Sequence, residues 1–454
     1  MSVAAAHDPL SLDAIRSLAA EILEHDRWSR EQLLAYQRER LRGFLRHTVE
    51  RSPFYREALG AGAADQALES LPTLSKRVLM EHFDRVVTDP RLRRRDLEAF
   101  LADAEEGALY LGEYRIFATA GTSGVPGIFV YSSAEFAHWI ALSLAALARV
   151  GVTPTTRFVA IGAPSALHVT RQLFAAFQVG REGVPGLSVA TPLEETVASL
   201  NGYQPEAMLA YAGVLGILAD EQLHGRLDIR PRVVIATSEV LTEDTVARVE
   251  AAWGIPPVNG YAATEAPPIA TGSLDNVGMH VWEDSAIVEV VDDADRPVPP
   301  GEPGAKVLLT NLVNRTQPLI RYELSDSAVV ADGPDPSGRP WLRLARVDGR
   351  SDDILTLPGR ECGEVRVHPH RLRAPFARVP GVRQFQIVHA VEGLLVRIVP
   401  REDAGSGLEN EVRDAVANAL SEAGAYLPVN VTVVDEIERE PGPGAKLRLV
   451  RSAV

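Results

Sequence analysis

The feature of this sequence that most constrains its fold is an alternation of apolar strand patterns and helix patterns between residues 114 and 270. Strand patterns stand at residues 158–161 and 233–236, and helix patterns at residues 207–222 and 242–253. Because helices alternating with strands pack against the faces of the sheet that the strands form, this order predicts an α/β domain.

The rest of the chain follows a Pro/Gly-rich turn at residues 296–304 and has different patterns. Strand patterns stand at residues 305–310, 327–331, 388–399 and 429–433, and a helix pattern at residues 408–423. The C-terminal patterns predict a small α+β unit. Since 454 residues exceed what one hydrophobic core usually serves, we expect a large domain at residues 1–348 and a small one at residues 349–454.

Composition and charge exclude several classes of protein. No apolar run approaches the roughly 18 residues of a membrane-spanning helix, and the N-terminus lacks a basic start, so we expect a cytoplasmic protein with no membrane partner. The single cysteine, Cys362, excludes an intramolecular disulfide and a multi-cysteine zinc cluster. A formal net charge of −15 disfavours nucleic-acid binding, because it repels a phosphate backbone.

A loop rich in glycine and hydroxyl side chains, residues 119–127, stands between two apolar strand patterns. Its glycines permit close approach of backbone N–H groups to an anion, and its hydroxyls add donors to phosphate oxygens. The candidate ligands are Thr119, Gly121, Thr122, Ser123 and Gly124. The same composition also suits an ordinary hairpin loop. No lysine follows the second glycine, so the segment is not a GxxxxGK[ST] loop.

Four further polar motifs each have two interpretations. In one, the motif binds a nucleotide; in the other, its side chains are structural or exposed to solvent. Thr264 and Glu265 follow a strand of the predicted sheet, at the edge where ligands gather. Asp326 either caps a turn or accepts hydrogen bonds from the two hydroxyls of a ribose. Arg350 stands in a polar, glycine-containing loop typical of a linker between domains. Lys446 stands on a glycine-rich tail, where most lysines are solvated.

These motifs, in this order, resemble those of the adenylate-forming superfamily, and residues 52–55, 71–76 and 278–284 resemble its phenylacetate–coenzyme A ligase branch. The resemblance extends over most of the chain. It implies a large N-terminal domain of mixed sheets flanked by helices, with a β-rich subdomain, and a small mobile α+β C-terminal domain. Three positions depart from the family pattern, which has serine, lysine and glycine there: Ala120, Gly127 and Ala445.

The resemblance also implies a role for each motif. Residues 119–127 match the loop that holds the pyrophosphate of ATP. Of the single residues, Glu265 would reach Mg²⁺, Thr264 would lie beside the phosphate and acyl groups, Tyr261 near the nucleotide, Asp326 on the ribose and Arg350 beside the nucleotide. The C-terminal domain would turn about a hinge near Asp352, and Lys446 would swing into the active site as a catalytic residue together with Thr264 and Glu265.

The pocket for the acid is expected in regions that match the family's pocket-lining segments. These regions contain His138, Trp139, Ala163, His168, Ala212 and Gly213. Apolar and aromatic side chains suit an aryl or short hydrophobic carboxylic acid. His168 either binds a substituent of the substrate or lies in the core.

The resemblance therefore predicts an enzyme that uses ATP and Mg²⁺ to activate a small carboxylic acid as an acyl-adenylate and then passes the acyl group to coenzyme A. Two alternatives stay open. In the first, the acceptor is an amine or another nucleophile in place of coenzyme A. In the second, the chain is a catalytically silent homologue that only binds nucleotide, an alternative that the three departures from the family pattern support. The sequence leaves the oligomeric state open, a homodimer included.

Overall fold

The computed structural model describes residues 11–454 except residues 105–106, 120–126, 166–167, 179–182, 276–277, 351–352, 361–362, 380 and 441–444, and except the side chains of residues 175–178, 370 and 377. The helices are α1 (Leu12–Glu24), α2 (Arg30–Arg51), α3 (Pro53–Leu59), α4 (Lys76–Glu81), α5 (Phe83–Val86), α6 (Arg94–Asp103), α7 (Ser133–Arg149), α8 (Val169–Gln178), α9 (Leu193–Tyr203), α10 (Ala212–Leu223), α11 (Glu243–Trp253), α12 (Pro369–Arg373) and α13 (Leu408–Glu422).

The strands of the N-terminal part are β1 (Tyr114–Thr119), β2 (Gly127–Ser132), β3 (Phe158–Ile161), β4 (Ala207–Tyr211), β5 (Val233–Thr237), β6 (Val258–Ala263), β7 (Ala266–Gly272), β8 (Met279–Val281), β9 (Ala286–Val291), β10 (Lys306–Asn311), β11 (Tyr322–Leu324), β12 (Asp326–Val330) and β13 (Arg343–Arg350). Those of the C-terminal part are β14 (Leu355–Pro358), β15 (Glu364–Val367), β16 (Val382–Ala390), β17 (Gly393–Pro400), β18 (Val429–Val433) and β19 (Val450–Ser452).

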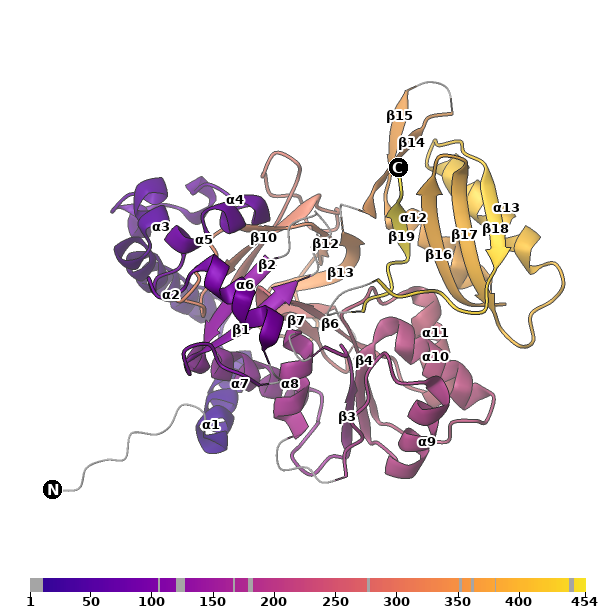
Figure 1. Ribbon diagram of the computed structural model, residues 1–454, viewed down its shortest axis with the longest axis horizontal. Coiled ribbons are helices and arrows are strands. Elements are labelled where there is room, and N and C mark those ends of the chain that lie inside the picture. Colours follow the sequence, from indigo (N-terminus) through magenta and orange to yellow (C-terminus); the bar gives the residue numbers. More distant parts are fainter. Residues whose placement is uncertain are drawn as a thin grey trace.

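The largest sheet has eight strands in the order β12-β13-β8-β7-β6-β5-β4-β3. Strands β3 to β6 are parallel, and the pairs from β6 to β12 are antiparallel. Helices α9, α10 and α11 lie beside the parallel strands (Figure 1). The expected α/β architecture is therefore confirmed. One element differs from expectation, because residues 207–211 form a fully buried strand before α10 begins at Ala212.

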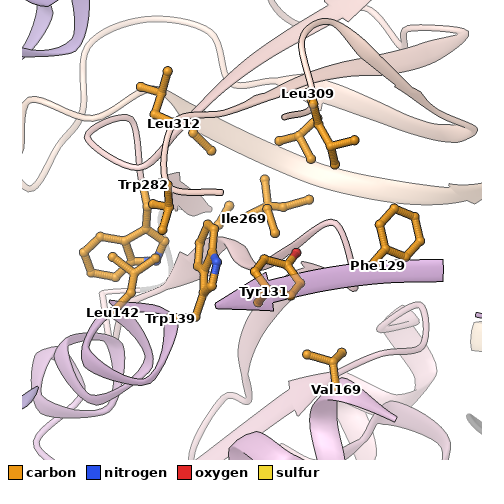
Figure 2. Close-up of a cluster of buried hydrophobic side chains, with 14 of the residues drawn as sticks. Phe129, Tyr131, Trp139, Leu142, Val169, Ile269, Trp282, Leu309 and Leu312 are labelled. Carbon is orange, nitrogen blue, oxygen red and sulfur yellow. The ribbon is translucent and has the colours of Figure 1, made fainter. Parts of the chain in front are cut away.

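The N-terminal helices and the antiparallel strands share one hydrophobic core with this sheet. Side chains from β2, α7, β7 and the region around β10 meet in it, among them Tyr131, Trp139, Ile269 and Trp282 (Figure 2). Helix α2 begins with a capping box, in which the Ser29 hydroxyl accepts from the Gln32 N–H and the Gln32 side chain accepts from the Ser29 N–H. Such a cap contributes about 1 kcal/mol to helix stability.

The C-terminal strands and α13 enclose a second hydrophobic core of their own, between Leu355 and Val450. Its four-stranded sheet has the order β18-β17-β16-β19, and this part lies above α10 and α11 in Figure 1. The predicted small α+β unit is thus present. In the described part of the chain, no helix is both long and apolar enough to cross a membrane.

Candidate active site

A cleft of about 760 Å³ is lined by residues of both the N-terminal and the C-terminal parts. The described site residues that the sequence predicts for the nucleotide and for catalysis all line it: Thr119, Tyr261, Thr264, Glu265, Asp326, Arg350 and Lys446. Gly121, Thr122, Ser123 and Gly124 of the loop, and the hinge residue Asp352, lie outside the described residues. Side chains separated by more than three hundred positions in the sequence therefore share one cavity.

The topology of the sheet explains why these side chains meet. The loop after β5 and the turn after β6 both stand at the carboxyl ends of parallel strands, which is the edge where ligands bind in such sheets. Strands β1 and β2 form an antiparallel hairpin that brings Thr119 opposite Gly127, so the two ends of the predicted phosphate loop are paired.

Tyr261 on β6 and Asp326 at the start of β12 are joined by a hydrogen bond, although three strands separate β6 from β12 in the sheet order. The Tyr261 hydroxyl donates a 2.8 Å hydrogen bond to Asp326 Oδ2. Burial raises the pKa of Tyr261 well above its ordinary value, and the nearby Asp326 carboxylate adds to this effect. The phenol therefore stays protonated as a donor, and it fixes the orientation of the carboxylate that is predicted to bind the ribose.

Glu265 is a buried carboxylate surrounded by cationic and hydroxyl groups. Burial raises its pKa above the ordinary value, while Lys76, Arg350 and a hydrogen bond with Tyr322 act in the opposite direction. No group of three or more metal-ligating side chains occurs among the described residues. A single carboxylate is nevertheless sufficient for Mg²⁺, which commonly binds one or two carboxylates together with substrate phosphates. The donor set at Glu265 therefore fits a magnesium ion that arrives with ATP.

Lys446 enters the same cleft from the C-terminal part of the chain. Burial lowers its pKa, and Arg350 acts in the same direction, whereas the carboxylates of Asp326, Glu239 and Glu265 raise it. The Lys446 ammonium group therefore lies between carboxylates and the Arg350 guanidinium, and these two cations can together bind a further anion. This is the environment that a transferring phosphate requires.

Lys76 is a cleft residue for which the sequence analysis proposed no role. It is the first residue of α4, and its Nζ donates a 3.1 Å hydrogen bond to Thr119 Oγ1. A Cβ atom added at Gly127 would lie 2.8 Å from Lys76 Cε. The ammonium group thus lies beside the position where the family loop has its lysine. Residues 71–76 were visible in the sequence as a motif of the branch, but their sequence distance from the loop concealed the contact.

A second, apolar cavity of about 110 Å³ adjoins the cleft and shares His168, Thr264 and Lys446 with it. One wall is a single face of α7, because its lining residues have the spacing i, i+3, i+4 and i+7: Ser143, Ala146, Leu147 and Val150. Helix α8 adds Val169, Leu173 and Phe174. This cavity has the apolar character expected of a pocket for a small hydrophobic acid.

His168 lies where the two cavities join, and its Nδ1 accepts a hydrogen bond from the N–H of Thr170, whose hydroxyl also contacts this nitrogen. Burial, assisted by the nearby Lys446, lowers the pKa of His168 to about 3. The imidazole is therefore neutral near pH 7, and its proton is on Nε2, since Nδ1 is an acceptor.

The other predicted acid-binding residues do not line either cavity. His138 bonds to Ser285 Oγ at 2.9 Å, and burial lowers its pKa to about 4. Ala163 and Ala212 are buried, and Trp139 belongs to the core in Figure 2. The Gly213 N–H donates to Glu239. The α7 wall of the apolar cavity begins five residues after His138, and its residues lie one to three turns further along the chain than His138.

Comparisons with known proteins agree with this architecture. No family model matches the chain. A 2-hydroxyisobutyryl-CoA ligase, solved in the postadenylation state with an acyl-AMP, superposes with a TM-score of 0.74 at 20% identity and covers 99% of this chain and 94% of its own. The fold is therefore that of the adenylate-forming CoA ligases.

The sequence relatives give a narrower placement. The phenylacetate–coenzyme A ligase of Thermus thermophilus is 28% identical over 81% of this chain and 80% of the relative. That of Aromatoleum evansii is 25% identical over 86% of this chain and 87% of the relative. The predicted resemblance to the phenylacetate–coenzyme A ligase branch is confirmed.

Proposed function

We propose that this chain is an AMP-forming acid–coenzyme A ligase. It activates a small carboxylic acid with ATP and then transfers the acyl group to coenzyme A. The observation that carries the proposal is the convergence of Glu265, Asp326 and Lys446 on one cleft that adjoins an apolar cavity. The relatives' names and the shared fold support the same activity.

In the adenylation step, the carboxylate of the acid attacks the α-phosphorus of ATP and pyrophosphate leaves. Negative charge builds on the bridging and pyrophosphate oxygens, so the site must hold cations and donors there in advance. Lys76 and Thr119 lie at the pyrophosphate loop, and Lys446 lies at the junction of the two cavities. When bound at Glu265, Mg²⁺ would supply further positive charge to the phosphates. Asp326, oriented by Tyr261, would hold the ribose.

The second step requires room for coenzyme A. Because Lys446 lies buried between the nucleotide site and the acid cavity, we propose that the C-terminal domain, residues 349–454, rotates about Asp352 once the acyl-adenylate exists. The thiol can then attack the acyl carbon and displace AMP. The division of the chain at residue 348 and the hinge at Asp352 are part of the proposal.

The acid is proposed to be small and largely apolar, because its cavity is formed by the α7 and α8 faces. Thr271 also lines this cavity, and its buried Oγ1 has no hydrogen-bond partner among the described residues. An unpaired buried hydroxyl is unfavourable until a ligand satisfies it. We therefore propose an acid with one hydrogen-bonding substituent, such as an aryl hydroxyl or amino group, in addition to its carboxylate.

Pyrophosphate exchange tests the adenylation half of the proposal. Radiolabelled pyrophosphate enters ATP only when an acyl-adenylate forms reversibly, and a panel of matched acids with and without a ring hydroxyl or amine would reveal the preferred substrate. Exchange with none of them would favour the silent homologue. Lys446→Ala should abolish exchange while ATP binding persists.

Product analysis tests the acceptor. The adenylate is offered coenzyme A and, in parallel, amines, and the thioester is the expected product. Formation of an amide alone would establish the alternative acceptor. The cytoplasmic location and the homodimer stay predictions from the sequence.

A further inference from the structure

Glu239, in the loop after β5, connects the two parts of the chain directly beside Lys446. Its Oε2 accepts a 2.9 Å hydrogen bond from the N–H of Gly213, at the start of α10. Its Oε1 accepts from the N–H of Leu447 at 2.8 Å and from Arg439 Nη1 at 2.7 Å. The side chain is only 6% exposed. One carboxylate thus binds a donor of the large domain and two donors of the segment that carries Lys446.

Hydrogen bonds from Arg439 and Glu440 also hold the backbone of residues 445–446. Arg439 Nη1 donates to the carbonyl of Ala445 at 3.1 Å, and the N–H of Glu440 donates to the carbonyl of Lys446 at 2.9 Å. The backbone groups on both sides of the lysine side chain are therefore fixed by hydrogen bonds. The bonds from Leu447 and Arg439 to Glu239 hold residues 445–447 beside the large domain, and the Lys446 side chain lines the cleft.

The energetics of this contact depend on its burial. Hydrogen bonds to an ionised acceptor are stronger than neutral ones, and removing one partner of a buried charged pair leaves the other unsatisfied. Glu239 also raises the pKa of Lys446 in opposition to burial. The same carboxylate therefore both holds the lysine segment and favours the charged form of the lysine.

We infer that Glu239 is a positioning residue that anchors the Lys446 segment for adenylation and releases it before thioester formation. The inference rests on the proposed function, in which Lys446 acts in adenylation and then leaves the cleft. All of the segment's contacts with Glu239 join the two domains, so they break when the domains rotate. Glu239 is expected to matter for the first half-reaction and not for the second.

The test measures the two half-reactions separately in the full-length protein. Glu239→Ala should lower pyrophosphate exchange by about 10- to 100-fold, which corresponds to roughly 1.4–2.7 kcal/mol of transition-state stabilisation. Thioester formation from a chemically prepared acyl-adenylate and coenzyme A should stay within about twofold of the unmodified protein. Glu239→Gln keeps one acceptor oxygen but loses the charge, and it should give an intermediate exchange rate.

The control is another ion pair between the two domains, Arg226 with Glu402 at 3.0 Å, in which Glu402 is exposed. Glu402→Gln should leave both half-reactions unchanged. An equal loss of both half-reactions in Glu239→Ala would overturn the inference, because it indicates a general structural defect, and so would an unchanged exchange rate. If the unmodified protein shows no exchange with any acid, the proposed function fails instead.

Discussion

At the residue scale, Glu265, which is proposed to hold Mg²⁺, is a buried carboxylate that lowers the stability of the folded protein. Its pKa is raised by burial, so the folded protein binds this proton more tightly than the unfolded chain does. The ionised carboxylate therefore lowers stability at pH values above its folded pKa, and this cost disappears as the pH falls through that value.

Glu265→Gln removes this buried charge and keeps the shape of the side chain. We expect the variant to have a higher Tm than the unmodified protein near pH 7, measured by calorimetry without ligands, and to lose Mg²⁺-dependent pyrophosphate exchange. The Tm difference should shrink in acid, because the unmodified carboxylate then becomes protonated. A Tm difference that is independent of pH would contradict the assigned cause.

Ala445 occupies a backbone conformation that favours glycine. Its φ is +43°, in the left-handed region, where a residue with a Cβ is less stable by roughly 1–2 kcal/mol. The sequence alone marked this position as a departure from the family pattern, and the conformation explains why the pattern has glycine.

Ala445→Gly should relieve the strain. We expect a small gain in stability, about 1 kcal/mol or less, because glycine also gains freedom in the unfolded chain. Urea denaturation measures the gain, and pyrophosphate exchange should be retained. A clear loss of stability would show that the positive φ is not a source of strain.

At the scale of elements, the sequence predicted several helices and strands of the main sheet and of the C-terminal part, but not every boundary. Strands β3 and β5 and helices α11 and α13 were predicted within a residue or so of their observed bounds. Residues 207–222 were expected to form one helix because they are apolar almost throughout. A parallel strand buried on both faces has the same apolar character as a buried helix, so periodicity could not separate β4 from α10.

The candidate site was predictable where a motif is short and local, and not where elements meet. Thr264, Glu265 and Asp326 were identified by their patterns, and the structure brings them to one cleft. The pocket face of α7 and the contact of Lys76 with Thr119 depend on packing between elements that no local pattern records.

The β1–β2 hairpin gives a prediction about the departure at Gly127. A Cβ there would lie 2.8 Å from Phe129 Cε2 and from Thr119 Oγ1 as well as from Lys76 Cε, and Phe129 is fully buried. Gly127→Lys should therefore lower pyrophosphate exchange at least 10-fold, even though it restores the family pattern.

A second variant at this hairpin is Lys76→Met, which removes the charged ammonium group and keeps the unbranched, apolar stem of the side chain. It should raise the KM for ATP without changing the Tm appreciably. Exchange activity in Gly127→Lys that equals or exceeds that of the unmodified protein would contradict the steric interpretation.

At the scale of the whole molecule, polar contacts join the N-terminal and C-terminal parts of the chain. Arg248 donates to the carbonyl of Arg383, and Arg401 lies 3.5 Å from Asp244 across the same boundary. Polar contacts between domains can be replaced by water when the domains separate, whereas a large apolar contact cannot. These polar contacts are compatible with the proposed rotation of the C-terminal domain.

Asp352→Pro tests the proposed hinge. Proline fixes φ near −65°, so it should hinder a rotation that requires a large backbone change at this position. We expect pyrophosphate exchange to persist and thioester formation from a prepared acyl-adenylate to fall at least 10-fold. Asp352→Ala serves as the control and should retain both activities. Equal behaviour of the two variants would place the hinge elsewhere.

The contact between Lys76 and the β1–β2 hairpin affects how homologous sequences are assigned as active or inactive. A lysine at position 127 would occupy the space that the Lys76 side chain fills. We therefore expect each homologue to have a lysine at one of these two positions and not at both. Homologues that lack the loop lysine should not be set aside as inactive until the residue equivalent to Lys76 has been inspected.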